Sequence, residues 1–174
     1  TIAVLKKAKR ELTNVQNSGM SIMEMSHRSK EYEEVHNRAQ RLLRELLNIP
    51  DSYDVLFLQG GASLQFAMIP MNFLGNGVGS YILTGSWSKK ALKEAEKLGK
   101  TSVAATSEET NFDRIPSFDE IKIDENAAYV HLTSNNTIYG TQWREFPQIS
   151  QNLIADMSSD ILSRPLDVSQ FKLI

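Results

Sequence analysis

Apolar side chains in the first fifty residues recur with the period of an amphipathic helix. A first set is spaced by three or four positions, at Ile2, Leu5, Ala8, Leu12 and Val15, and an Asn-Ser-Gly sequence at 17–19 ends it. A second set begins after Ser29, a residue type that caps helix N-termini, and continues to about Leu47. The pattern therefore predicts two helices, at about residues 2–15 and 29–47.

Beyond residue 50, short apolar runs alternate with helical segments and polar turns. We expect buried strands at 55–58, 80–84, 102–106, 127–133, 153–156 and 171–174. Helices are expected at about 63–73, where Pro70 should kink the helix or end its regular part, and at 89–98; a capping box at 117–120 opens a short one. This alternation predicts an α/β fold, with a mostly parallel sheet covered by helices on both faces.

Small and polar residues follow the carboxyl ends of several predicted strands, at 60–63, 85–88, 134–137 and 156–159. In open α/β sheets, ligands bind at that edge. Gly60 and Gly61 lead into a helix that begins at Ala62 and Ser63, where unpaired N–H groups and the helix dipole favour an anion such as phosphate. The turn matches neither G-x-G-x-x-G nor the P-loop, and most strand-Gly-Gly-helix turns only connect two elements.

The same crevice would contain Trp87, Thr137 and Asp156. An indole can stack on a flat ring, a carboxylate can hold a ring nitrogen protonated, and a hydroxyl can bond to a ring oxygen. With the phosphate cradle, this set suits pyridoxal phosphate. Taken singly, Trp87 is more often a packing residue, and Asp156 is more often a helix cap.

Composition narrows the class of protein. The 174 residues suffice for one domain with a core, and a formal net charge of -2 gives no basic surface for nucleic acid or membranes. Without cysteine there are no disulfides or thiolate metal sites, which favours a cytosolic protein, and no apolar run is long enough to span a bilayer. His27, His36 and His131 lack metal-ligand spacing, so we expect no metal site.

Segments spread over essentially the whole chain resemble a known family in order and spacing. They are 19–28 (Gly-Met-Ser-Ile-Met-Glu-Met-Ser-His-Arg), 59–67 (Gln-Gly-Gly-Ala-Ser-Leu-Gln-Phe-Ala), 85–87 (Gly-Ser-Trp) and 156–165 (Asp-Met-Ser-Ser-Asp-Ile-Leu-Ser-Arg-Pro). By these the chain is identified as a member of the phosphoserine aminotransferase family. The resemblance implies a large domain of fold type I, a pyridoxal-phosphate cofactor and a cytoplasmic homodimer. It also implies amino transfer between glutamate and 3-phosphohydroxypyruvate in the biosynthesis of serine and pyridoxine.

The resemblance assigns a role to each matching position. Ala62 and Ser63 would hold the cofactor phosphate, and Trp87 would stack on the ring. Thr137 would bond to the ring oxygen, and Asp156 would pair with the ring nitrogen. Arg28 would bind a substrate anion, because a guanidinium suits carboxylate and phosphate. His27 would help to bind the substrate phosphate, from a partner subunit.

The chain departs from the family in places. Some members have Gly-Arg at Ala62-Ser63, many have Glu at Asn136, and Tyr139 stands near a commonly acidic position; we expect the reaction to be unchanged. The Ala-Gly-Ala-Gln-Lys-Asn motif that carries the Schiff-base lysine is absent. The sequence also begins without Met and stops inside a predicted strand. We therefore expect residues 1–174 to be a partial cofactor-binding domain that lacks the catalytic lysine and the C-terminal small domain.

Two other functions stay open. The first is another fold type I enzyme, such as a relative of the cysteine desulfurases, which would share the cofactor crevice but not the segment around His27 and Arg28. The second is a non-catalytic α/β binding module, for which the shortness of the chain is the best argument.

Overall fold

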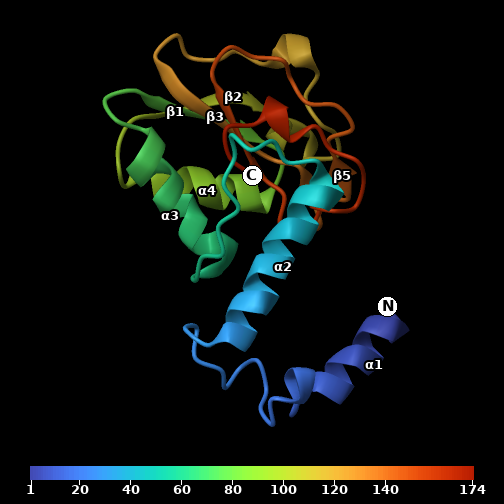
Figure 1. The fold of residues 1–174 in the computed structure, drawn as a ribbon. Coiled ribbons are helices and arrows are strands. Elements are labelled where there is room, and N and C mark those ends of the chain that lie inside the picture. Colours follow the sequence, from blue (N-terminus) through green and yellow to red (C-terminus); the bar gives the residue numbers. More distant parts are fainter. The chain divides into compact units, whose positions relative to one another are not determined.

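The structure is a computed structural model that describes all of residues 1–174, and it divides into two compact units. The units are Thr1–Val55 and Leu56–Ile174, and each is described by itself. The first is helical, and the second contains the sheet (Figure 1). The prediction that residues 1–174 form one partial domain stays a prediction.

Helices α1 (Ile2–Glu11) and α2 (Lys30–Leu47) form most of the first unit. The α1 helix ends earlier than its apolar pattern predicts, because Val15–Asn17 is a separate 3-10 turn, η1, in which Gln16 has a φ of 52°. The cap of α2 is as predicted: the Ser29 hydroxyl accepts a hydrogen bond from the N–H of Tyr32 at 3.3 Å.

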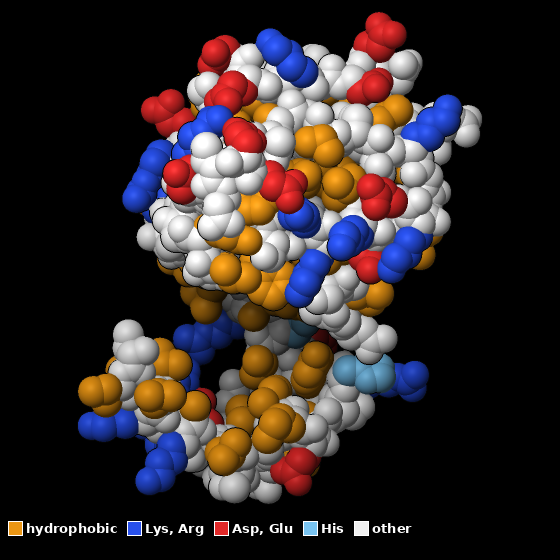
Figure 2. All heavy atoms as spheres, turned by 180° about the vertical axis from the view of Figure 1, so that it is seen from behind, with side chains coloured by type: hydrophobic (Ala, Val, Ile, Leu, Met, Phe, Trp, Pro, Cys, Tyr) orange, Lys and Arg blue, Asp and Glu red, His pale blue; other side chains and the backbone are white.

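A cleft of about 550 Å³ lies in this unit, and its lining comes from α1, from α2 and from the segment that joins them. Leu12, Met23 and Leu42 line it and stay more than 40% exposed. Hydrophobic side chains gather at the surface of this unit, whereas charges of both signs are scattered over the unit that contains the sheet (Figure 2).

The predicted strand at 55–58 is wrong. These residues are irregular, and Leu56, Phe57 and Leu58 are each more than 50% exposed. The boundary between the two units falls inside this run. An apolar run alone does not make a strand, because a strand also needs a neighbouring strand for its backbone hydrogen bonds.

The second unit is built on a parallel sheet with the strand order β2-β1-β3-β6, which confirms the predicted fold class. The strands are β1 (Val78–Leu83), β2 (Thr101–Thr106), β3 (Ala127–Thr133) and β6 (Asn152–Asp156). Asn135–Asn136 (β4) and Thr141–Gln142 (β5) form a small antiparallel pair directly after β3. The last predicted strand is reduced to one bridge, between Leu173 and Ile154.

Helices α3 (Gly61–Phe73) and α4 (Ser86–Glu96) pack on one face of the sheet (Figure 1). Pro70 does not end α3, because the N–H of Leu74 still donates to the Pro70 carbonyl at 3.1 Å. The other face packs against Trp143, Phe146 and Phe171, which lie in irregular segments. Within residues 56–174, α-helices therefore cover one face of the sheet, and not both faces as expected. Short 3-10 turns complete the unit, at Glu108–Thr110 (η2), Phe118–Glu120 (η3) and Val168–Gln170 (η4).

The expected capping box is present at η3, the second of these three turns. Glu120 accepts hydrogen bonds from the Ser117 N–H and hydroxyl, both at 2.7 Å. It opens a 3-10 turn of three residues rather than an α-helix. None of the helices combines the length and the hydropathy that crossing a bilayer requires.

Candidate functional site

The carboxyl ends of β1, β3 and β6 lie side by side at one edge of the sheet. All pairs are parallel, and the register places Tyr81 beside His131 and Thr133 beside Asp156. The residues that follow these strands therefore meet at one edge, as the sequence predicts. Trp87 follows β1 in the first turn of α4, Thr137 follows β3 and β4, and Asp156 is the last residue of β6.

The turn from β1 into α4 is held by Ser88. Its buried hydroxyl accepts hydrogen bonds from the N–H groups of Thr84 and Gly85, at 3.0 and 3.2 Å, and donates to the Gly85 carbonyl at 2.9 Å. The turn is tight, because a Cβ added to Gly85 would lie 3.0 Å from Tyr139 and 3.1 Å from the side chain of Asn136. Trp87 is expected before the helix, but it lies in the first turn of α4.

Trp87 and Thr137 are in contact. The indole N–H of Trp87 donates to the Thr137 hydroxyl at 3.5 Å, at the long end of the hydrogen-bond range. The Lys90 ammonium lies 4.4 Å from the centre of the Trp87 ring, so a flat ligand would stack on the opposite face. Thr137 is exposed, whereas Trp87 is half-buried. The structure thus brings an aromatic ring and a hydroxyl together at the open edge of the sheet.

Asn136 fixes the segment that carries Thr137. Its buried side chain accepts a hydrogen bond from the Thr84 hydroxyl at 3.1 Å and donates to the hydroxyl of Thr141 at 3.2 Å. These bonds link the end of β1 to the β4–β5 pair. In the sequence Asn136 is one of several polar residues after β3, and nothing there indicates that its side chain, rather than a neighbouring one, is buried.

Asp156 is the last residue of β6 and is half-buried. Its Oδ1 accepts hydrogen bonds from the Ser158 N–H at 3.0 Å and from the Ser158 hydroxyl at 2.5 Å. This local turn resembles a helix cap, yet no helix follows. The second carboxylate oxygen is thus left for another partner.

Hydrogen bonds to Asp160 fix the segment that follows Asp156. Burial opposes ionisation of this side chain, but hydrogen bonds from Ser163 and Arg164 outweigh it and hold its pKa below the usual range. Gln142 also donates to Asp160, at 2.7 Å. The Ser159 hydroxyl accepts a hydrogen bond from the Asn135 amide at 3.0 Å. Hydrogen bonds therefore join the two connections at the sheet edge that follow β3 and β6.

Ala62 and Ser63 lie in the first turn of α3, and both are exposed. Gly60 caps this helix with a φ of 94°, a conformation that favours glycine. The exposed first turn leaves N–H groups free for an anion, and α3 packs against α4, which carries Trp87. The hydrogen bonds of the structure do not join this turn to Trp87, Thr137 or Asp156.

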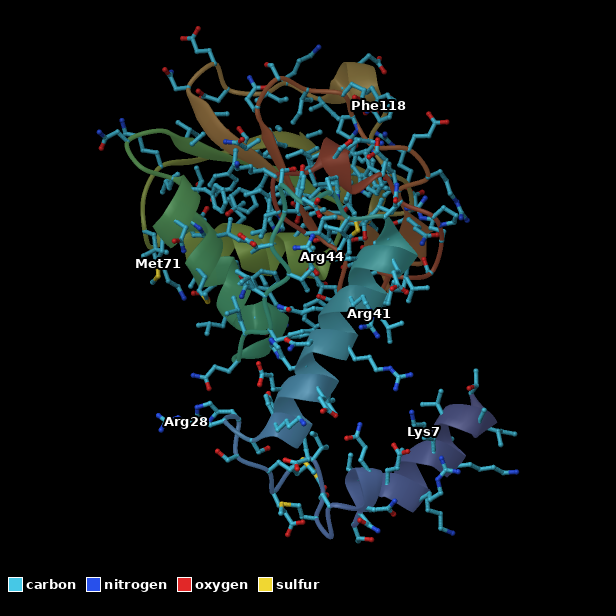
Figure 3. All side chains as sticks on the ribbon, viewed as in Figure 1. Lys7, Arg28, Arg41, Arg44, Met71 and Phe118 are labelled. Atoms are coloured by element: carbon cyan, nitrogen blue, oxygen red, sulfur yellow. The ribbon has the colours of Figure 1, made fainter.

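His27 and Arg28 belong to the other unit, Thr1–Val55, and both are exposed. They lie just before α2, and the Arg28 side chain points away from the ribbon of its unit (Figure 3). The Arg28 N–H donates to the Ser26 hydroxyl at 3.2 Å. Their role as anion-binding residues stays a prediction.

Two buried polar residues close to this edge are missed by the sequence reasoning. His131 and Thr133 lie on β3 and are 1% and 3% exposed. Burial lowers the pKa of His131 to about 4, against the opposing effect of the Asp156 charge. Their polar character inside an apolar strand is the only signal in the sequence.

The chain is similar to known proteins in sequence and in fold. The sequence profile of the family "Aminotransferase class-V" matches residues 1–173. The phosphoserine aminotransferase of Geobacillus kaustophilus is 64% identical over 174 residues, which are 99% of this chain and 48% of that protein. The enzyme of the same name from Bacillus subtilis is 56% identical, with the same coverage.

Solved structures show the same similarity. A phosphoserine aminotransferase from Bacillus circulans subsp. alkalophilus has a TM-score of 0.93 at 57% identity, over 98% of this chain and 48% of that one. A phosphoserine aminotransferase from Trichomonas vaginalis with bound pyridoxal phosphate has a TM-score of 0.90 at 42% identity, over 98% of this chain and 51% of that one. The chain thus spans about half the length of the relatives it matches.

Proposed function

This chain belongs to the class-V aminotransferase family, and from that premise we propose that it is part of the cofactor-binding domain of a pyridoxal-phosphate-dependent phosphoserine aminotransferase. The complete protein would exchange an amino group between glutamate and 3-phosphohydroxypyruvate. It would act in the cytoplasm, in the biosynthesis of serine and pyridoxine. The Schiff-base lysine and the small domain would belong to parts of the protein outside these 174 residues.

The observation that carries the proposal is the meeting of Trp87, Thr137 and Asp156 at one sheet edge. Trp87 and Thr137 are 3.5 Å apart between side-chain atoms, and Asp156 ends the neighbouring strand β6. An aromatic face, a hydroxyl and a carboxylate are the groups that a pyridine ring with a phenolic oxygen requires. The residues present therefore fit pyridoxal phosphate.

The phosphate of the cofactor fits the first turn of α3. Its free N–H groups and the helix dipole favour an anion, and the exposed Ser63 adds a hydroxyl. No arginine follows Ala62 here, so the backbone of this turn would supply most of the stabilisation of the phosphate charge.

When bound, pyridoxal phosphate withdraws electrons from an amino acid, and the amino group can then move between two substrates. Asp156 would hold a proton at the ring nitrogen, which requires a negative carboxylate oriented by Ser158. Trp87 would cover one face of the ring, with Lys90 on the far side of the indole. The Thr137 hydroxyl would donate a hydrogen bond to the ring oxygen.

His27 and Arg28 would bind the phosphate or carboxylate of the substrate. Arg28 is exposed and extends away from the ribbon of its unit, so its guanidinium is accessible to an anion (Figure 3). We propose a homodimer in which His27 acts in the site of the partner subunit.

Amino-donor specificity tests the proposed function. The complete protein, loaded with pyridoxal phosphate, is given 2-oxoglutarate with L-phosphoserine, L-cysteine or L-alanine, and glutamate formation is measured. We expect a kcat/KM for L-phosphoserine that is on the order of 100-fold higher, because the pocket must pair the phosphate charge. Equal rates with the three donors, or sulfur release from L-cysteine, would contradict the assignment.

A further inference from the structure

Three polar side chains lie in a row on the sheet face beneath α3. They are His131 and Thr133 on β3 and Asp156 on β6. The register pairs Thr133 with Asp156 and His131 with Ile154, and residues two apart on a strand share a face. The His131 ring lies 6.4 Å from that of Phe66 in α3, which identifies the face.

The two β3 residues are buried without hydrogen-bond partners. Both ring nitrogens of His131 and the hydroxyl of Thr133 are unpaired. The surrounding side chains on this face are mostly apolar or aromatic, with the Tyr81 ring 5.1 Å from the His131 ring. Unpaired buried polar groups destabilise a fold, so a reason other than packing is needed for both of them.

Asp156 is the charged group that acts on His131, and it is the register partner of Thr133. The other titratable groups on this face are the buried Tyr81 and Tyr129, whose hydroxyls share a hydrogen bond at 2.7 Å, and the half-buried Tyr139. From α3 the neighbour is Phe66, and α4 contributes Ala91 and Ala95 to this core. Burial lowers the pKa of His131 to about 4, so its ring is neutral at pH 7 and offers one N–H donor and one acceptor.

We propose that His131 is a positioning residue: although it makes no hydrogen bond to Asp156, it and Thr133 place polar groups beside Asp156 on the buried side of the sheet, and their dipoles favour the carboxylate position that faces the ligand. Ser158 fixes one carboxylate oxygen from the solvent side, and the β3 pair acts from the opposite side. A charged residue at position 131 would neutralise or repel the carboxylate, and an apolar residue would offer it no polar group. This inference rests on the proposed function, because Asp156 matters here as the partner of the ring nitrogen.

A double-mutant cycle on cofactor affinity tests the inference. The dissociation constant for pyridoxal phosphate is measured by absorbance titration of the complete apoprotein, for wild type, His131→Leu, Asp156→Asn and the double variant. We expect His131→Leu to weaken binding about tenfold in the wild-type background and less than about twofold with Asp156→Asn. Tyr129→Phe is the matched control, because it disturbs a buried polar group on the same face and should leave the affinity unchanged.

Each outcome decides the inference. Equal weakening by His131→Leu in both backgrounds, or no weakening at all, would overturn it and leave the proposed function intact. A wild-type protein that does not bind pyridoxal phosphate would overturn the proposed function, and the inference with it. If His131→Leu does not fold, His131→Gln replaces it. Because an amide keeps a donor and an acceptor, that variant should bind within about twofold of wild type, and a tenfold loss would contradict the role.

Discussion

At the scale of single residues, Asp156 is the group on which the proposed chemistry depends most. Its turn with Ser158 leaves one oxygen for a ligand, and its strand position places it beside the connection that carries Thr137. Asp167 forms the same turn elsewhere in the chain: its Oδ1 accepts hydrogen bonds from the Ser169 N–H and hydroxyl. Asp167 therefore provides an internal comparison for the local structure alone.

Asp156→Asn should lower kcat of the complete enzyme on the order of 100-fold, because an amide does not keep the ring nitrogen protonated. Cofactor binding should persist in part. Asp167→Asn removes the same charge from an equivalent turn and should leave kcat unchanged. Steady-state kinetics of both variants check this, and normal turnover by Asp156→Asn would remove the assigned role.

His131 also makes the stability of the fold depend on pH. Its pKa is about 4 in the folded chain and about 6.5 when unfolded, so between these values the unfolded chain binds a proton that the folded chain does not. The free energy of unfolding should therefore decrease, by up to about 3 kcal/mol, as the pH drops from 6.5 towards 4. Urea unfolding of wild type and His131→Gln at pH 7 and pH 4.5 measures this. A loss of equal size in the variant would contradict the assignment.

At the scale of elements, the connection from β1 to α4 controls where Trp87 lies. Ser88 closes the turn, and Gly85 is packed against the connection after β3. The φ of Gly85 is 162°, which any residue can adopt, so contact with its neighbours rather than backbone strain explains the glycine.

Gly85→Ala should destabilise the fold by about 1–3 kcal/mol, the usual range for overpacking. The added methyl group would press on Asn136, which cannot move freely because it is bonded to Thr84 and Thr141. Ala105→Gly, in β2, is the comparison variant, because it measures how far a change of packing elsewhere in the sheet lowers stability. Gly75→Ala would not serve, because the positive φ of Gly75 would add backbone strain. Thermal unfolding, with Trp fluorescence as a second readout, measures the effect. A stability equal to that of wild type would show that the turn is loose.

The four strands of the parallel sheet and helices α3 and α4 could be predicted from sequence, because their apolar patterns reflect real burial. The run at 55–58 could not, since its side chains are exposed and only the neighbouring backbone decides whether a strand forms. The edge residues Trp87, Thr137 and Asp156 could be named in advance from polar residues after strands. Asn136, Thr133 and His131 could not be assigned, because burial of a polar side chain depends on packing from distant segments.

At the scale of the whole molecule, we propose that the site is assembled from more than these 174 residues. The sheet edge supplies groups that would hold a cofactor, whereas the lysine that would bond to the cofactor is expected elsewhere in the protein. His27 and Arg28 lie in a separate compact unit.

The 174-residue chain, treated with pyridoxal phosphate and then borohydride, should gain no specific covalent label. The complete protein under the same treatment should be labelled at one lysine outside residues 1–174. Peptide mass spectrometry measures both. Stoichiometric labelling of one lysine in the 174-residue chain, abolished by its substitution with arginine, would contradict this division.

The most direct test of the account is a crystal structure of the complete protein with pyridoxal phosphate. We expect the phosphate at the first turn of α3, near Ala62 and Ser63, and the ring on the face of Trp87 opposite Lys90. We also expect the ring nitrogen at Asp156 and the ring oxygen at Thr137. A cofactor bound away from the carboxyl edge of β1, β3 and β6 would contradict the account.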